Sequence, residues 1–248
     1  MSRKRYSSIG FNRDIKMSWL DFVANLVLKG SLPNEIHSAL DDLLKDRLSV
    51  NSTAKRSSRE KTITILLKTW ARPDPVLESL RDRGLMLFDT TFNNARLCLH
   101  WGMTMAAYPF CALVAETVGR LFRLQGEAHS AEVQRRVRER FGQRETVSRS
   151  TRCALRSFVE WGAIKDTDKK GVYQAAPKVD VSDPTTTYWM LEALLHTTES
   201  GTGMLSALVA SPALFPFNME SLHGRPPNEF DKIEVIPHSW DDFILKLK

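Results

Sequence analysis

Residues 130–174 constrain the fold of this chain more than any other stretch, because glycines divide them into segments of different periodicity. The first segment has an apolar residue at every fourth position and ends at Gly142, as an amphipathic helix does before a chain reversal. The second segment is also helical in pattern and ends at Gly162. Two short strand-like runs then enclose a polar tip, residues 166–170. This order predicts a winged helix-turn-helix over residues 130–176.

The excess positive charge of the chain is concentrated in this module. Eight arginines lie between positions 135 and 156, and only Glu139 and Glu145 oppose them, so the local net charge is 8 − 2 = +6. The formal net charge of the whole chain is also +6. The eight are Arg135, Arg136, Arg138, Arg140, Arg144, Arg149, Arg152 and Arg156. Because arginine suits bidentate contact with phosphate or guanine, the pattern favours nucleic acid as the acidic partner.

Six basic residues of the module are candidate DNA contacts. Three arginines are spaced three and four positions apart, so they share a face of the second helix, away from Leu155 and Phe158. A fourth arginine precedes that helix, and two lysines occupy the hairpin tip. The six are Arg144, Arg149, Arg152, Arg156, Lys169 and Lys170. A charged run on a helix is usually a solvated face, but such a face mixes signs for pairing, and this one scarcely does.

A second candidate helix-turn-helix spans residues 31–70. Gly30 ends one amphipathic helix, Ser31 can cap the next, and a polar turn leads to a third predicted helix, residues 53–70. The first turns of this third helix are basic, where a recognition helix would touch DNA. The residues concerned are Lys55, Arg56 and Arg59. The alternative is a helical hairpin with a solvated basic end.

Helical periodicity over most of the chain predicts a mainly α protein with a few short strands. We expect two helical domains, residues 1–107 and 108–248, the second carrying the winged module and a helical and β-hairpin tail. Further predicted helices span residues 16–29 and 185–197, and a short one ends at Gly84. Residues 214–217 read as extended, and residues 232–236 and 242–247 as strands.

Two apolar predicted helices, residues 91–107 and 109–124, need a separate interpretation, since together they resemble a membrane span. Pro109 interrupts them, and their charge-free run, residues 101–115, is shorter than the roughly 20 residues that a bilayer core requires. We therefore expect two buried helices and no membrane partner. The polar N-terminus lacks the apolar segment of a secretory signal, and the isolated cysteines suit a reducing compartment, so we expect a cytoplasmic protein.

No catalytic motif stands out in the sequence. The six histidines show no metal-ligand spacing, and the three cysteines form no CxxC pair. A phosphate-binding loop of the GxxxxGK[ST] type and a GxSxG nucleophile elbow are both lacking. We therefore expect no catalytic, cofactor-binding or metal-binding residues. A nuclease built on scattered carboxylates would escape such a search.

Several local signatures along nearly the whole chain resemble one known family. They are the SIGF run at residues 8–11, the VLKG helix end at residues 27–30, STAKR at residues 52–56 with Arg59 and Glu60 after it, the apolar helix pair around Pro109, and LFPF at residues 214–217. In this combination the chain resembles the BrxA-like proteins, the small helical component of BREX phage-defence systems. The resemblance implies a mainly helical, two-domain, DNA-binding accessory protein encoded with a methyltransferase and ATPases. It supplies no catalytic residues.

The resulting expectation is a non-enzymatic DNA-binding protein of a BREX-type defence system. Its expected partners are double-stranded DNA, through the basic helix-turn-helix faces, and other BREX-type defence proteins. Three alternatives remain open at this point. The chain could be a transcriptional regulator with a defined operator, a protein-interaction adaptor whose winged module docks on another subunit, or an RNA-binding factor.

Overall fold

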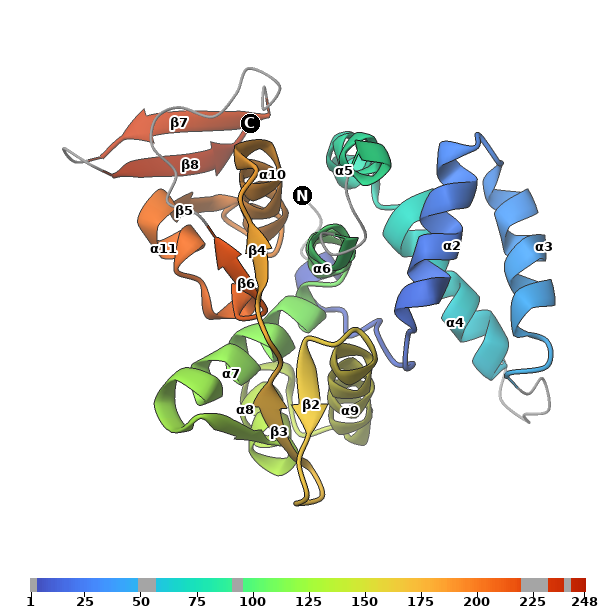
Figure 1. Ribbon diagram of the computed structural model, residues 1–248, viewed down its shortest axis with the longest axis horizontal. Helices are drawn as coiled ribbons and strands as arrows, with labels where there is room; N and C mark the ends of the chain where they lie inside the picture. Colours follow the sequence, from blue (N-terminus) through green and yellow to red (C-terminus); the bar gives the residue numbers. More distant parts are fainter. Residues whose placement is uncertain (1–3, 49–56, 91–95, 220–231, 239–241) are drawn as a thin grey trace.

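The computed structural model describes residues 4–48, 57–90, 96–219, 232–238 and 242–248 (Figure 1). It is mainly helical with a few short strands, as the sequence predicts. Figure 1 places α2, α3 and α4 on the right and the helices and strands of residues 127–175 at the bottom. The C-terminal strands lie at the upper left of the same view.

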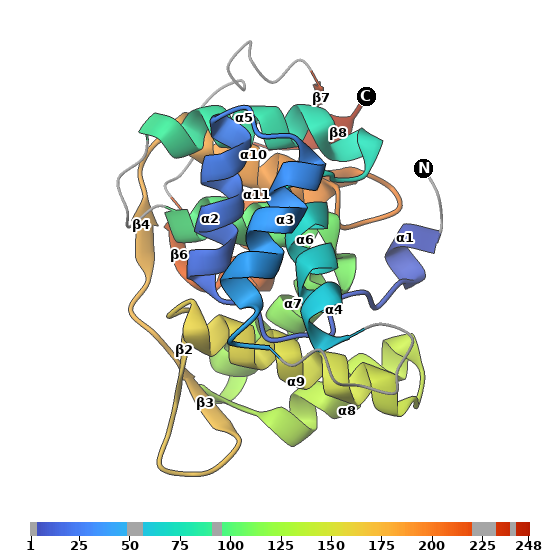
Figure 2. The same cartoon turned by 90° about the vertical axis from the view of Figure 1, so that its right-hand side faces the viewer.

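The N-terminal half is built from amphipathic helices whose buried faces follow the predicted periodicity. The elements are α1 (Lys4–Ser7), α2 (Met17–Leu28), α3 (Pro33–Leu44), α4 (Ser58–Leu66), the π-helical turn η1 (Leu67–Ala71), the 3₁₀ turn η2 (Pro75–Leu77) and α5 (Glu78–Thr90). Within them Trp19, Ile36 and Trp70 are buried. Figure 2 shows α2 and α3 side by side, with α8 and α9 below them.

Two helix starts differ from prediction. The helix predicted from residue 53 begins at Ser58, because Ser57 is extended and its hydroxyl accepts a hydrogen bond from the Glu60 N–H at 3.1 Å. Helix α3 is preceded by Leu32 rather than capped by Ser31. The Glu35 carboxylate accepts from the Leu32 N–H at 2.7 Å, which satisfies one of the free amides of the first turn.

The two apolar helices are α6 (Arg96–Ala107) and α7 (Pro109–Gln125), and the chain bends by 120° between them, at Tyr108. Among the described helices none is by itself long and apolar enough to cross a bilayer, and this bent pair alone reaches the required length and composition. Residues 97–112 are buried throughout. The prediction of two buried helices that meet near Pro109 is confirmed.

Helix α10 (Pro184–Leu195) inserts the indole of Trp189 into a slot between two glycines. A Cβ added at Gly84 of α5 would lie 2.7 Å from the Trp189 ring, and one added at Gly102 of α6 would lie 2.5 Å from it. The indole N–H donates to the Leu80 carbonyl at 2.8 Å. The predicted helix end at Gly84 is therefore wrong, because this glycine gives clearance to a ring rather than a stop to the helix.

Residues 109–175 form a compact unit around a three-stranded antiparallel sheet. After α7 come β1 (Glu127–His129), α8 (Ser130–Phe141), α9 (Glu145–Glu160), β2 (Ile164–Asp166) and β3 (Val172–Ala175). The strand order is β1-β3-β2, so β3 is central and Tyr173 lies opposite both Ala128 and Asp166. The two helices and the β2–β3 hairpin were predicted, whereas β1 was not. The residues that precede the two helices are His129 for α8 and Arg144 for α9, and neither caps its helix with a side-chain hydrogen bond.

The C-terminal part adds two small sheets to the helical body. Strand β4 (Val179–Val181) pairs in parallel with β6 (Phe217–Met219). The other sheet has the antiparallel order β5 (Thr202–Met204), β8 (Phe243–Leu247), β7 (Ile233–Pro237). Helix α11 (Leu205–Val209) and the 3₁₀ turn η4 (Pro212–Leu214) lie between them in sequence. The two predicted C-terminal strands are confirmed, but of the extended run at residues 214–217 only Phe217 lies in a strand.

Buried apolar side chains form one continuous cluster from Phe11 to Leu245. Trp101 of α6 stands near its centre, with its ring 4.6 Å from that of Phe158 on α9 and 5.5 Å from that of Phe215. The predicted domain boundary coincides with the break between α6 and α7. The division into two domains stays a prediction.

Candidate nucleic-acid interface

Helix α9 is covered on most of its circumference and exposes one narrow stripe. Its apolar side packs against α7, α8 and β2 through buried residues that include Val147, Leu155 and Phe158. Its exposed residues include Arg149, Arg152 and Arg156, which recur at spacings of three and four. We call these three side chains the α9 arginine stripe. Their placement on one exposed face is as the sequence predicts.

The three arginines of the stripe differ in what holds them. One guanidinium nitrogen of Arg156 bonds both carboxylate oxygens of Asp166 on β2, at 2.8 and 3.1 Å, and this bond raises the pKa of Arg156. Arg152 pairs with Glu145 in the first turn of the same helix, at 3.0 Å. Arg149 forms no ion pair with any carboxylate in the described part of the chain. It is therefore the member of the stripe most available to an external anion.

Helix α8 mixes charge signs more than the sequence count suggests. Arg135 pairs with Glu139 at 2.6 Å, and Arg136 pairs with Glu132 at 2.7 Å. Neither Glu132 nor Asp166 belongs to residues 135–156, over which the net charge of +6 was counted. The prediction that this basic run scarcely mixes signs is wrong for α8. The uncompensated charge is concentrated on α9 and around the α8–α9 turn.

The hairpin that joins β2 to β3 presents its two lysines to solvent. Lys169 and Lys170 are exposed at the tip. The turn is closed by its own hydrogen bonds, since the Thr167 N–H donates to the Val172 carbonyl at 3.1 Å and the Val172 N–H to the Lys169 carbonyl at 3.1 Å. Gly171 has a φ of +77°, which favours glycine at this position. The tip is thus a preformed projection with two cations.

The second predicted surface is only partly described. Lys55 and Arg56 lie outside the described residues. Arg59 is in the first turn of α4, where its side chain is 15% exposed and its Nε bonds Asp41 of α3 at 2.8 Å. This ion pair ties α4 to α3, so Arg59 is a structural contact and a weak candidate for DNA.

Sequence reasoning missed a basic residue from the far end of the chain, Arg13. It belongs to an extended segment, residues 11–16, which we call the N-terminal strap. The Ile15 N–H donates to the Ser157 hydroxyl at 2.8 Å, and the Trp161 indole N–H donates to the Ile15 carbonyl at 2.8 Å. The strap is therefore fixed to the side of α9. No local pattern could reveal this, because residues 15 and 157 are 142 positions apart.

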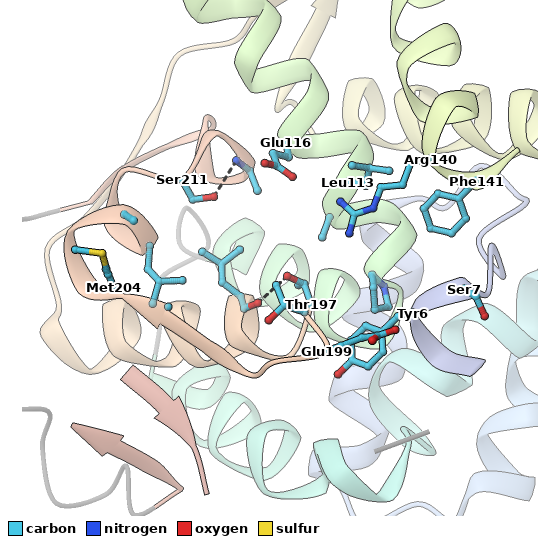
Figure 3. Close-up of a pocket in the computed structure, with 18 of the residues that line it drawn as sticks. Tyr6, Ser7, Leu113, Glu116, Arg140, Phe141, Thr197, Glu199, Met204 and Ser211 are labelled. Atoms are coloured by element: carbon cyan, nitrogen blue, oxygen red, sulfur yellow. Dashed lines mark hydrogen bonds between the residues drawn. The ribbon is translucent and has the colours of Figure 1, made fainter. Parts of the chain in front are cut away.

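A groove of about 670 Å³ lies beside the α8–α9 turn (Figure 3). Arg140 and Phe141, from the end of α8, line one side, and Tyr6 and Glu199 line another. Arg144, the fourth predicted DNA contact on the helical part of the module, also lines this groove. Its guanidinium donates to the Phe141 carbonyl at 3.1 Å, so it braces the turn rather than joining the α9 arginine stripe.

Buried titratable side chains in the helical core include His100, Cys98 and Cys111. His100 is fully buried; its Nδ1 accepts from the Trp70 indole at 3.0 Å, and its Nε2 lies 3.1 Å from Asp21 Oδ1. Burial raises the pKa of the Cys98 and Cys111 thiols. Across the described ranges, no three His, Cys, Asp or Glu side chains converge as metal ligands would.

Comparison of the chain with protein-family models, curated proteins and solved structures gives no match. A function must therefore be inferred from the side chains themselves. The strongest local signal among them is the α9 arginine stripe, which is flanked by the β2–β3 hairpin and the N-terminal strap.

Proposed function

We propose that this chain binds duplex DNA by placing α9 in the major groove, with the β2–β3 hairpin beside the phosphate backbone. The observation that carries the proposal is the α9 arginine stripe, in which Arg149, Arg152 and Arg156 occupy the exposed face of an otherwise covered helix. The major groove is about 12 Å wide and admits one helix. Arginines along the exposed face would then reach base edges and phosphates.

The order of elements supports this orientation. Helices α7 and α8 precede α9 in the chain and pack against it, and β2 and β3 follow it directly. This is the order of elements in a winged helix-turn-helix. In such a module the second helix of the turn enters the groove and the hairpin lies alongside. The Arg156–Asp166 ion pair fixes the hairpin to α9. The module thus has its two contact elements held at a defined separation.

The individual residues have distinct roles under this proposal. Arg149 and Arg152 are the direct contacts, with Arg152 exchanging Glu145 for phosphate. Arg156 is a positioning residue, because it is engaged with the hairpin. Lys169 and Lys170 at the tip contact phosphate without reading sequence. The chain is proposed to do this without catalysis.

A role in a BREX-type phage-defence system is the cellular part of the proposal, and it is supported by the sequence resemblance alone. Its prediction is biochemical. The protein should co-purify with other components of such a system, either directly or through DNA to which those components are bound. The mixed-sign ion pairs on α8 favour that exposed helix as the surface for a protein partner, since α9 would be occupied by DNA.

The decisive measurement is fluorescence anisotropy with a labelled random-sequence duplex over a salt series. If six phosphates are neutralised, log affinity should fall with log salt at a slope of about −5. Replacing Arg149, Arg152 and Arg156 together with Glu should abolish binding. Affinity that survives this change would refute the site assignment.

A charge-matched control separates the site from net charge. The exposed residues Lys29, Arg120 and Lys246 lie at the end of α2, on α7 and on β8, respectively, and their triple replacement by Glu changes the net charge equally. This control should retain most of the affinity. The same assay with RNA and single-stranded DNA tests the RNA-binding alternative. A ratio of about 10³ or more for one sequence over random DNA would favour the operator-specific regulator.

A further inference from the structure

The N-terminal strap is anchored at both ends and leaves one cation between the anchors. At one end the ring of Phe11 is buried and lies 5.5 Å from that of Tyr108, edge to face. At the other end Ile15 is fixed by its hydrogen bonds to Ser157 and Trp161. Arg13 is half-buried between them. Its position is therefore set by the fold rather than by a flexible terminus.

The strap runs along α9 in the same direction as the helix. Ile15 contacts Ser157, Asp14 faces the thiol of Cys153, and Arg13 lies near Arg149. Positions 149, 153 and 157 of α9 are four residues apart, so they lie on one side of the helix, next to Arg152 and Arg156. The hairpin is joined to α9 through Arg156, and the strap follows the opposite flank (Figure 1).

The guanidinium of Arg13 is oriented by neutral groups. Its Nε donates to the Ser58 hydroxyl at 3.0 Å and one Nη to the Asn12 carbonyl at 2.5 Å. In the described part of the chain neither Arg13 nor Arg149 forms an ion pair with a carboxylate. Burial lowers the pKa of Arg13, and repulsion by Arg149 lowers it further, more than Asp14 raises it.

The charges of Arg13 and Arg149 repel each other in the free protein, and in the described part of the chain no ion pair balances either of them. A phosphate between them would reverse the sign of that interaction, because arginine binds phosphate by charge-assisted hydrogen bonds. Asp14 does not serve this purpose, since it is turned toward Cys153, where burial and then the Asp14 carboxylate raise the pKa of the thiol to about 12. The arrangement has the charge of an anion site that the chain itself does not fill.

We propose that Arg13 and Arg149 together bind one phosphate of the DNA backbone, at the edge of the groove that α9 enters. This inference rests on the proposed function and adds a contact from a separate part of the chain. Through Ser58 the same residue touches the first turn of α4. The strap is therefore tied at Arg13 to the helix that carries Arg59.

The test is a double-mutant cycle in the full chain. Arg13→Gln, Arg149→Gln and the double variant are titrated with a labelled random-sequence duplex over a salt series. The double variant should make the salt slope shallower by about 0.9, the value for one phosphate, and neither single change should exceed this. The double variant should lose less affinity than the two single losses combined, because both side chains bind one phosphate. Arg13→Lys should keep most of the slope, since it keeps the charge.

Lys246→Gln on β8, far from α9 in Figure 1, is the charge-matched control and should leave the slope unchanged. Thermal melting of each variant shows whether it is folded at the assay temperature. If the wild type binds DNA but Arg13→Gln and Arg13→Lys behave like the control, the Arg13 contact is refuted and the proposed function stands. Strictly additive losses refute the shared phosphate. A wild type that binds no duplex refutes both.

Discussion

Arg149 and Arg156 have nearly equivalent positions in the sequence pattern but different surroundings in the fold. Spacing alone places both side chains on the exposed side of α9, and the structure confirms that both are exposed there. Their charged neighbours could not be predicted from spacing. Asp166 pairs with Arg156 from β2, whereas Arg149 is near another cation, Arg13, from the far end of the chain. Periodicity defines which way a side chain points, whereas ion pairing depends on the tertiary arrangement.

The Glu145–Arg152 pair gives a residue-scale prediction. Glu145 is 78% exposed and lies 3.0 Å from Arg152, so it competes with phosphate for that guanidinium. Glu145→Gln should therefore strengthen DNA binding by about 0.2–1 kcal/mol, the range of an exposed ion pair. Anisotropy at low salt measures the change. Glu160→Gln, at the exposed end of the same helix, is the matched control, and an equal gain there would mean that only net charge matters.

At the scale of elements, the long periodic helices and the glycines that end them at positions 30, 142 and 162 were predicted well, whereas the role of Gly84 was not. The buried faces of α2, α8 and α9 follow directly from apolar spacing. Gly84 was misread because a glycine in a helical pattern suggests an end, and the ring of Trp189 that requires it belongs to a helix about a hundred residues later. Strand β1 has only three residues, too few for alternation to show. Its pairing with β3 decides its conformation.

The glycine slot gives a prediction at this scale. Gly102→Ala should destabilise the protein by about 1–3 kcal/mol through overpacking against Trp189, although alanine is the better helix former by about 1 kcal/mol. Urea denaturation measures the loss. Adding Trp189→Phe to Gly102→Ala relieves the contact, so the double variant should lose less than the two single changes combined. A Gly102→Ala variant as stable as the wild type would contradict the slot.

At the scale of the whole molecule, the N-terminal segment connects parts that the sequence assigns to different domains. A guanidinium nitrogen of Arg5 donates to the carbonyls of Ala106, at the end of α6, and of His196, just after α10. Arg83 of α5 pairs with the buried Glu192 of α10. Because these contacts span the chain, their arrangement could not be derived from local patterns.

His196 makes the stability of this arrangement depend on pH. Its side chain is 5% exposed, and burial, with repulsion from Arg5 and Arg83, lowers its pKa from 6.5 to about 4. Between these values the unfolded chain binds a proton that the folded chain excludes. The free energy of unfolding should therefore fall as pH drops from 6.5 towards 4, by up to about 3 kcal/mol.

Urea denaturation at pH 7 and pH 5 checks this dependence. His196→Gln should lose less stability between the two pH values than the wild type does. Some dependence should remain, because burial also lowers the pKa of His100 and acts with the same sign. An identical loss in wild type and variant would show that His196 does not contribute.

The N-terminal strap also has a consequence for the order in which the chain folds. Its hydrogen bonds to α9 span 142 and 146 positions, and the Arg5 bond to His196 spans 191. We expect contacts of such separation to form late in folding, because closing a long loop costs more chain entropy than closing a short one. During synthesis the strap leaves the ribosome before α9 exists. The flank of α9 that carries Arg13 can therefore be completed only after α9 itself has been translated, although the strap is made long before it.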